Sequence, residues 1–268
     1  MERIEHALTG SERKEVLEWL QSKCHDPSAT HRSIFQNHEE HTSSWLSKWK
    51  KWDSWLHLEK PPEDRFLWIH GIPGAGKSVL ASFIIESIRS HCDHVAHQPL
   101  GYAYYYCHYT HKEDGGFPLL RWIIGSLSRQ AEWAPPQLRS IRDSGHESTI
   151  PELLGVLQPI LDRFSAVYVV VDGVDESQPR MHTLSVLSML ATDERFQAIR
   201  LLVTSRVYQD IESAFSGISA SISMSNTFVY QDIQTVIHKW VTSSPRMRCW
   251  SHLHPWIEDQ VCSGAKGM

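Results

Sequence analysis

The chain has 268 residues and a formal net charge of −5, with 41% hydrophobic and 21% charged residues. This composition is ordinary for a globular protein, and its acidic balance argues against a general binder of nucleic acid or of an anionic membrane. Five widely spread cysteines favour a reducing compartment over a disulfide framework. Met1–His6 lacks the apolar core of a signal peptide, and no apolar run approaches the roughly 20 residues of a membrane helix. We therefore expect a soluble cytoplasmic protein with no nucleic-acid partner and no membrane partner.

Residues 1–60 are predicted to form a helical segment. A helix is expected over residues 1–22, followed by a turn-rich break over residues 24–31. Four tryptophans then recur at steps of four, three and three, namely Trp45, Trp49, Trp52 and Trp55. This spacing places them on one face of a helix, which is typical of packing. Because the lysines between them lie mostly off that face, we favour a helix docked on the next domain over a nucleic-acid stacking surface.

Residues 61–226 are predicted to form a nucleotide-binding domain organised around Gly71–Ser78. Strand-like Phe66–His70 precedes this stretch and a helical pattern follows it, which is the context of a phosphate-binding loop. The glycines allow close backbone approach, and backbone N–H groups surround a polyphosphate at the positive end of the helix. Lys77 is expected to reach the β- and γ-phosphates, and the Ser78 hydroxyl to bind Mg²⁺. The predicted nucleotide-binding residues are Gly71, Ile72, Pro73, Gly74, Ala75, Gly76, Lys77, Ser78 and Val79.

Strand and helix patterns alternate through the rest of this domain. Further strands are expected at residues 102–107, 166–171, 199–204 and 220–224, and helices at residues 79–88, 119–127, 151–161 and 184–190. The valine-rich run at residues 166–171 is typical of a strand that is buried on both faces. We therefore predict an α/β P-loop NTPase fold, with a doubly wound, mainly parallel sheet of about five strands and helices on both faces. A helical tail over residues 227–268 is expected to follow.

Charged residues follow two of the predicted strands at their carboxyl ends. Because ligands of open parallel sheets bind at these ends, we expect Asp172, Arg206 and the phosphate loop to converge. Asp172 has the position of an acid that holds Mg²⁺, directly or through water. Asp175 or Glu176 is expected to orient or deprotonate the attacking water, and the sequence does not decide between them. Arg206 is expected to contact the γ-phosphate by charge-assisted hydrogen bonding.

The order of these elements favours an NTPase over a nucleotide kinase. An additional strand at residues 102–107 lies in the sequence between the phosphate-loop strand and the Asp172 strand. Together with an acidic water-positioning residue, it indicates an ATPase-type P-loop protein. A kinase also needs an acceptor pocket and an arginine-bearing lid, and the sequence shows no clear candidate for either.

Three stretches together resemble a NACHT domain, which belongs to the STAND class of signal-transducing NTPases: Gly71–Ser78, Val169–Glu176 and Leu201–Arg206. More narrowly, the chain is similar to the NACHT (NLR-like) proteins of filamentous fungi. In those proteins a helix like that at Trp45-Leu46 precedes the phosphate loop, and a segment like Val229–Ile233 follows the arginine strand. The resemblance covers nearly the whole chain.

This resemblance implies a molecular switch in innate-immunity-like signalling. It implies that Asp172 is the Walker B acid and that Arg206 is the sensor arginine. It further implies ADP in a resting state, ATP in an oligomerising state, and slow hydrolysis of ATP or GTP with Mg²⁺. The implied partners are a second copy of the chain or signalling proteins, in self/non-self recognition or cell death.

The end of the sequence leaves two hypotheses open. NACHT proteins usually continue into a winged-helix region and sensor repeats, whereas this sequence ends at Met268, so we expect a fragment or a short gene product. Residues 227–268 would then be the start of a helical subdomain. The first hypothesis is a switch module that hydrolyses NTP slowly. The alternative is a non-hydrolysing nucleotide-bound module that binds a partner through the tryptophan helix or the helical tail.

Overall fold

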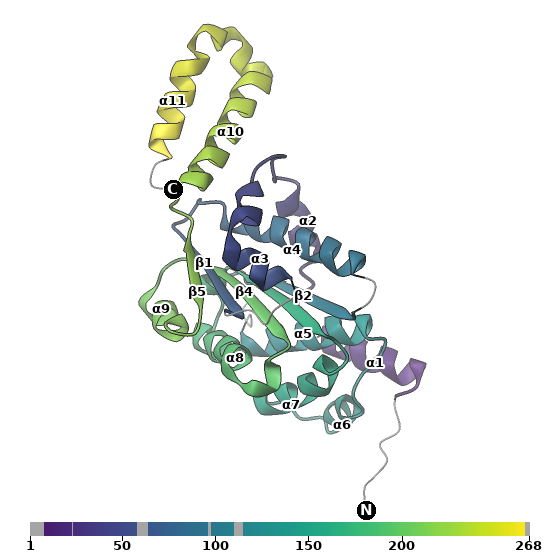
Figure 1. The fold of residues 1–268 in the computed structure, drawn as a ribbon. Helices are drawn as coiled ribbons and strands as arrows, with labels where there is room; N and C mark the ends of the chain where they lie inside the picture. Colours follow the sequence, from purple (N-terminus) through teal and green to yellow (C-terminus); the bar gives the residue numbers. More distant parts are fainter. Residues whose placement is uncertain (1–7, 23, 58–63, 96–97, 110–114, 266–268) are drawn as a thin grey trace, which may run out of the picture.

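A five-stranded parallel sheet forms the centre of the molecule (Figure 1). The computed structural model describes residues 8–22, 24–57, 64–95, 98–109 and 115–265. The strands, in the spatial order β2-β3-β4-β1-β5, are β1 (Phe66–His70), β2 (Leu100–Tyr106), β3 (Ala166–Asp172), β4 (Ile199–Ser205) and β5 (Ala220–Ser223). All neighbouring strands pair in parallel. This architecture confirms the predicted doubly wound α/β fold, including all five strands.

Helices cover both faces of the sheet, because side chains that alternate along each strand bury apolar groups on both sides. One hydrophobic cluster joins the first face to α1 (Gly10–Gln21), α5 (Gly116–Gln130), α6 (Gln137–Asp143), α7 (Ile150–Leu161), α8 (Arg180–Thr192) and α9 (Gln209–Phe215). A second cluster joins the other face to α4 (Lys77–His94) and to the tryptophan-rich segment. Two short 3-10 turns, η2 (Val174–Glu176) and η3 (Glu194–Phe196), follow β3 and α8.

The N-terminal segment differs from the prediction in two places. The tryptophan region is two short helices, η1 (Ser44–Lys48) and α3 (Lys50–Leu56), because Trp49 between them has an extended backbone with φ −84° and ψ 115°. The single helix predicted there was therefore wrong, although Trp45, Trp52 and Trp55 are buried, as a packing role requires. The expected break at residues 24–31 contains the start of α2 (Ser28–Phe35).

Helix α2 is held in place by a buried histidine. His31 contacts the Tyr106 hydroxyl at 2.9 Å through Nδ1 and the Glu86 carboxylate at 2.8 Å through Nε2. These tertiary contacts stabilise a helix that the local sequence does not indicate. The helix predicted over residues 1–22 begins at Gly10, where Thr9 and Glu12 form a capping box, and residues 1–7 lie outside the described residues. So does the expected domain boundary at residues 60–61.

The C-terminal part of the chain is a helical hairpin that projects from the rest of the molecule (Figure 1). It consists of α10 (Thr227–Ser243), η4 (Pro245–Leu253) and α11 (His254–Gly264). The structure thus confirms the predicted helical tail. The N-cap of α10 is Asn226, whose side chain accepts hydrogen bonds from the N–H groups of Phe228 and Val229. None of the helices in the described ranges has the length and apolar character needed to cross a membrane.

Candidate functional site

The phosphate loop connects β1 to α4 at the carboxyl edge of the sheet, as the sequence predicts. Gly74 and Gly76 both have φ +81°, a conformation that L side chains rarely adopt. Gly71 is needed for a different reason, since a Cβ there would lie 2.8 Å from the Cβ of Met224. The Lys77 ammonium donates to the carbonyl oxygens of Gly71 at 2.8 Å and Ile72 at 2.9 Å, and so lies inside the loop.

Ser78 and Asp172, the predicted metal ligands, lie together beneath the loop. Asp172 ends β3 with only 5% of its surface exposed, and burial raises the pKa of its carboxyl group. The Thr204 hydroxyl donates a hydrogen bond to this carboxylate, and the nearby Ser78 hydroxyl acts on the pKa of Asp172 in the direction opposite to burial. Carboxylate and hydroxyl oxygens fit Mg²⁺, which also takes ligands from water and from substrate phosphates. The donor set therefore suits a magnesium ion that is completed by a polyphosphate.

Asp175 and Glu176 are adjacent in η2 but have different surroundings. The Asp175 side chain is 5% exposed and its Oδ2 pairs with the Arg206 Nε at 3.1 Å. Its Oδ1 accepts from the Arg206 backbone N–H at 3.0 Å, and its carbonyl oxygen accepts from Arg180 at 3.1 Å. Within the described ranges, no hydrogen bond or ion pair joins the Glu176 carboxylate to another residue. Asp175 therefore holds the chain at Arg206, while Glu176 is available to a ligand.

The electrostatics of Lys77 show that the predicted charged residues converge. Burial lowers the pKa of the Lys77 ammonium group, while the carboxylates of Asp175 and Asp172 act in the opposite direction. Arg206 lowers the same pKa and Glu176 raises it, each by a smaller effect. One lysine thus interacts with every charged residue that the sequence predicts for this edge of the sheet. Such a mixture of charges suits a polyphosphate bound together with a divalent cation.

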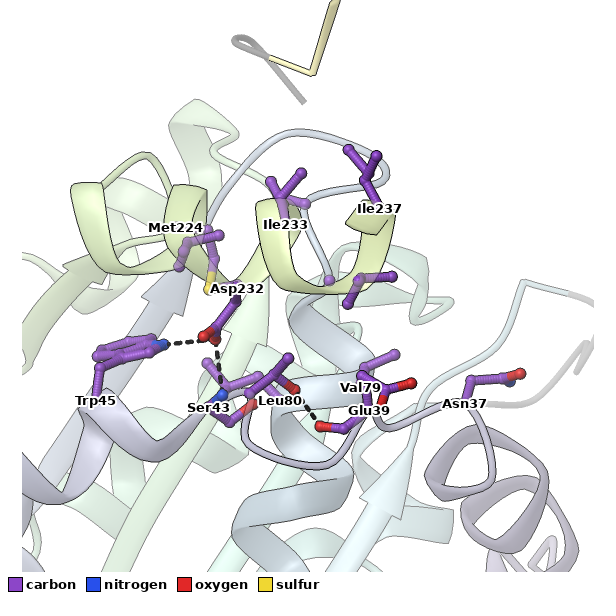
Figure 2. Close-up of a pocket in the computed structure, with 15 residues that line it drawn as sticks. Asn37, Glu39, Ser43, Trp45, Val79, Leu80, Met224, Asp232, Ile233 and Ile237 are labelled. Carbon is purple, nitrogen blue, oxygen red and sulfur yellow. Dashed lines mark hydrogen bonds between the residues drawn. The ribbon is translucent and has the colours of Figure 1, made fainter. Parts of the chain in front are cut away.

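Two cavities flank the phosphate loop. One of about 640 Å³ is lined by Gly71–Pro73 of the loop and by Arg206–Tyr208 after β4. The other, of about 250 Å³, lies between residues 37–45, the start of α4 and α10, and Figure 2 shows its lining. We call it the apolar pocket, because most of its lining side chains, including Val79, Leu80 and Ile233, are apolar. Of these lining residues, the sequence predicted only Ala75, Gly76 and Val79 as part of the site.

A comparison with family models matches residues 41–206 to the family described as Nephrocystin 3, N-terminal. The chain belongs to the Nephrocystin 3, N-terminal family. The matched region of this family covers the tryptophan segment, the phosphate loop and the strands β1–β4, and it ends at Arg206. A comparison with curated proteins found no match.

Solved structures with a similar chain trace include Cdc6 and ORC proteins. They are Cdc6p from Pyrobaculum aerophilum (16% identity, TM-score 0.47, 79% of this chain and 53% of that chain), the Aeropyrum pernix ORC1 protein in complex with DNA (12%, 0.46, 85% and 53%), and Drosophila ORC bound to DNA (13%, 0.45, 79% and 50%). This chain spans about half the length of these matched chains. At these identities the likeness concerns the P-loop NTPase fold alone.

One expectation is corrected by this comparison. The net charge led us to exclude a nucleic-acid partner, yet two of these similar structures contain DNA. The exclusion was wrong because a net charge of −5 is a sum over 268 residues and does not describe any local surface.

Proposed function

We propose that this chain is a switch module that binds ATP or GTP together with Mg²⁺. The observation that carries the proposal is the convergence of Lys77, Asp172, Asp175, Glu176 and Arg206 around one glycine-rich loop. In this proposal Lys77 moves from the loop carbonyl oxygens onto the β- and γ-phosphates, and Ser78 and Asp172 hold the magnesium ion. When bound, the ion neutralises charge that develops on the transferred phosphate.

We further propose that the module hydrolyses the nucleotide slowly and that the two acidic residues have different roles, which their different surroundings support. Glu176 orients and deprotonates the attacking water, because its carboxylate is not tied to another described residue. Asp175 acts on Arg206 instead, holding its guanidinium group beside the loop by an ion pair at 3.1 Å. Arg206 then responds to the γ-phosphate, whose negative charge competes with Asp175 for the same guanidinium group.

The finer assignment is a NACHT-type switch in NLR-like signalling. It rests on the resemblance of the motif set around Gly71–Ser78, Asp172 and Arg206, and it implies partners that are a second copy or signalling proteins. In this assignment residues 61–226 are the nucleotide-binding domain, and residues 227–268 begin a helical subdomain. The apolar pocket beside Gly76 supports a ligand that carries a base as well as phosphates.

Thermal unfolding with Mg·ATP and Mg·GTP tests the proposal. A ligand at a hundredfold excess over its Kd stabilises the folded protein by about 2.7 kcal/mol. We expect Lys77→Ala to abolish this gain, while Lys14→Ala, which changes an exposed lysine on α1, keeps it. The proposal fails if Lys77→Ala retains the full stabilisation, or if wild type shows none with either nucleotide.

A non-hydrolysing interaction module remains the second candidate. It is favoured by the apolar surface of the C-terminal hairpin, where Trp240, Trp250 and Trp256 are 51%, 52% and 62% exposed. Large exposed aromatic side chains are typical of protein interfaces. Single-turnover phosphate release distinguishes the two functions: release at saturating nucleotide supports the switch, and tight binding without release supports the interaction module.

A further inference from the structure

The Asp232 carboxylate joins two segments that lie far apart in the sequence. Its Oδ2 accepts hydrogen bonds from the Ser43 backbone N–H at 2.7 Å and from the Trp45 indole N–H at 3.1 Å (Figure 2). Burial raises the pKa of Asp232, and the two hydrogen bonds oppose that shift. A half-buried carboxylate on a helix is costly unless donors meet it. Its position here is therefore set by the contact with residues 43–45.

Two further contacts lie along the same face of α10. Phe228, Asp232 and Lys239 are separated by four and seven residues, a spacing that places them on one side of a helix. The Phe228 ring stacks on Trp45 with centroids 6.1 Å apart, and the Lys239 ammonium group pairs with the Glu39 carboxylate. Residues 39–45 thus hold α10 at three points, and Asp232 provides the middle one.

The apolar pocket lies between the two segments that these contacts join. Thr42, Ser43 and Trp45 form one wall, Asp232, Ile233 and Val236 form the other, and Gly76 and Val79 close the side nearest the phosphate loop. Its 250 Å³ is below the roughly 300–1,000 Å³ of pockets that enclose drug-sized ligands. It suits one ring system whose remaining atoms extend outward. The Ser43 and Trp45 donors are bonded to Asp232, so the distance between the walls depends on that residue.

We propose that Asp232 is a positioning residue for nucleotide binding. Through its hydrogen bonds, Asp232 holds residues 43–45 at the distance from α10 that a nucleobase needs. This inference rests on the proposed function, because it places the phosphates of the same ligand in the loop at Gly71–Ser78. Asp232 acts through Ser43 and Trp45 and touches neither the phosphates nor the reacting atoms. Its effect should therefore depend on whether the ligand carries a base.

Two probes separate the base from the phosphates: Mg·ATP or Mg·GTP, whichever binds wild type, and inorganic tripolyphosphate with Mg²⁺. Loss of a preorganised wall is expected to raise the Kd of the nucleotide about tenfold in Asp232→Ala. The Kd of tripolyphosphate should stay within about twofold, because no phosphate contact changes. Trp45→Phe, which removes only the indole donor, should show a smaller loss of the same kind. Thr235→Ala, on the same helix but bonded only within it, should match wild type.

Each result decides between explanations. Equal losses for both probes in Asp232→Ala and Trp45→Phe would show a general structural defect and overturn the positioning role. Unchanged nucleotide binding in both variants would also overturn it. If Asp232→Ala fails to fold, Trp45→Phe and Asp232→Asn test the proposal instead. The quantity compared is again the ratio of the nucleotide Kd to the tripolyphosphate Kd. If the wild-type protein binds tripolyphosphate as tightly as nucleotide, the proposed base contact is wrong, but the proposed function stands. If the wild-type protein binds neither probe, the proposed function itself is wrong.

Discussion

The phosphate side and the apolar pocket are neighbours, but they are built from different parts of the fold. The phosphate side, which comprises Gly71–Ser78, Asp172, Asp175, Glu176 and Arg206, rests on β1, β3 and β4, the three central strands. All residues of β3 and β4 are buried. The apolar pocket instead lies between residues 37–45 and α10, and three side-chain contacts join its walls.

This difference implies that the phosphate side is rigid, whereas the width of the apolar pocket can change. Moving Asp172 or Arg206 would require the central strands to shift, and their packing does not allow this without a large loss of buried apolar surface. Moving α10 requires the loss of a few polar and aromatic contacts and of the packing of Val229 and Ile233 on the second cluster, which involves fewer buried residues than a shift of β3 or β4. We therefore expect changes on the phosphate side to affect reaction and metal binding, and changes around the pocket to affect affinity for the base.

The largest expected effect tests the division of roles within the phosphate side. Glu176→Gln should lower the single-turnover rate of phosphate release by about 100-fold or more, because a general base contributes about that much, while the nucleotide Kd changes little. Asp175→Asn should lower the same rate less than Glu176→Gln, since it acts through Arg206. A larger loss in Asp175→Asn than in Glu176→Gln would reverse the assignment.

The next effect concerns the support of the tryptophan segment. Arg200 on β4 is 5% exposed and donates to the carbonyl oxygens of Trp55 and, at 2.8 Å, His57 at the end of α3. Arg200→Met leaves these acceptors without a donor, so we expect the free energy of unfolding to fall by about 2–3 kcal/mol. Urea titration measures it. Arg195→Met, which removes an exposed pair with Asp193, is the matched control and should change little.

If Arg200→Met lowers only the free energy of unfolding and leaves tripolyphosphate binding unchanged, the phosphate side does not depend on the tryptophan segment. If Arg200→Met instead weakened tripolyphosphate binding in the still-folded protein, the phosphate side would depend on the tryptophan segment. The comparison between a rigid and an adjustable region would then be wrong.

The position of the phosphate side in the fold was largely predictable from sequence, because its signals are local. Gly71–Ser78 is a continuous motif, and Asp172 and Arg206 follow apolar runs whose strand character is plain. The different surroundings of Asp175 and Glu176 were not predictable, because the two acidic residues are adjacent in one 3-10 turn and nothing in the local sequence indicates which of them pairs with Arg206. The contacts of Asp175 with Arg206 and Arg180 in the structure distinguish the two residues.

The apolar pocket, in contrast, could not be predicted from the sequence, because its walls come from segments that are far apart in the chain. Ser43 and Asp232 are 189 residues apart, and helical periodicity carries no information about which distant segment a helix face will contact. The backbone change at Trp49 was missed because the tryptophan spacing fits one continuous helix as well as two short ones. The sequence marked Asp232 only as part of the segment Val229–Ile233 that resembles other NACHT proteins, and this resemblance does not indicate which residues the carboxylate contacts.

The third prediction tests the metal ligands. Asp172→Asn keeps the shape of the side chain and removes its charge, so Mg²⁺ should bind at least about tenfold more weakly to the nucleotide complex. Thermal unfolding with nucleotide, with and without Mg²⁺, measures this, and the two curves should nearly coincide in the variant. Asp210→Asn, which changes the carboxylate paired with Arg180 at 2.7 Å, should retain the wild-type Mg²⁺ dependence.

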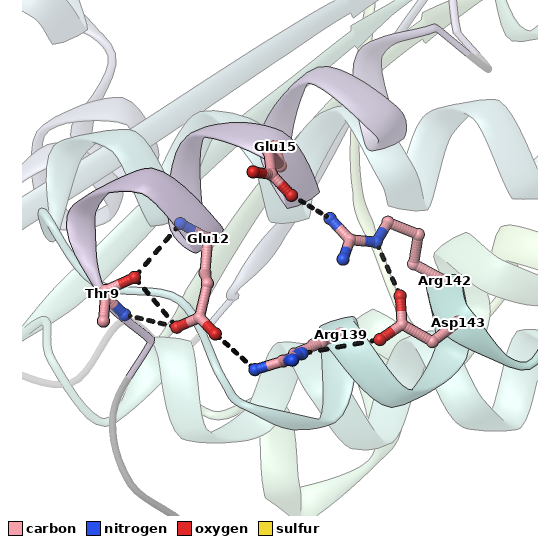
Figure 3. Close-up of polar contacts among 6 residues, drawn as sticks. All are labelled: Thr9, Glu12, Glu15, Arg139, Arg142 and Asp143. Carbon is pink, nitrogen blue, oxygen red and sulfur yellow. Dashed lines mark hydrogen bonds and ion pairs between the residues drawn. The ribbon is translucent and has the colours of Figure 1, made fainter.

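The smallest expected effect concerns the ion pairs within α6 and between α6 and α1, on the face of the sheet opposite α4 (Figure 3). Arg139 pairs with Glu12 and Asp143, and Arg142 pairs with Glu15 at 3.2 Å. The Arg139 side chain is 52% exposed, so solvent and salt screen these pairs. Arg139→Ala should lower Tm by no more than about 2 °C, and added salt should remove the difference.

Arg139→Ala also serves as a control for the binding measurements. Because α1 and α6 pack on the face of the sheet opposite α4, Arg139→Ala should change neither the nucleotide Kd nor the tripolyphosphate Kd. A change in the ratio of the two constants would mean that a surface contact on the far face reaches the apolar pocket. The central sheet would then transmit motion between its faces, and the rigidity assigned to the phosphate side would have to be abandoned.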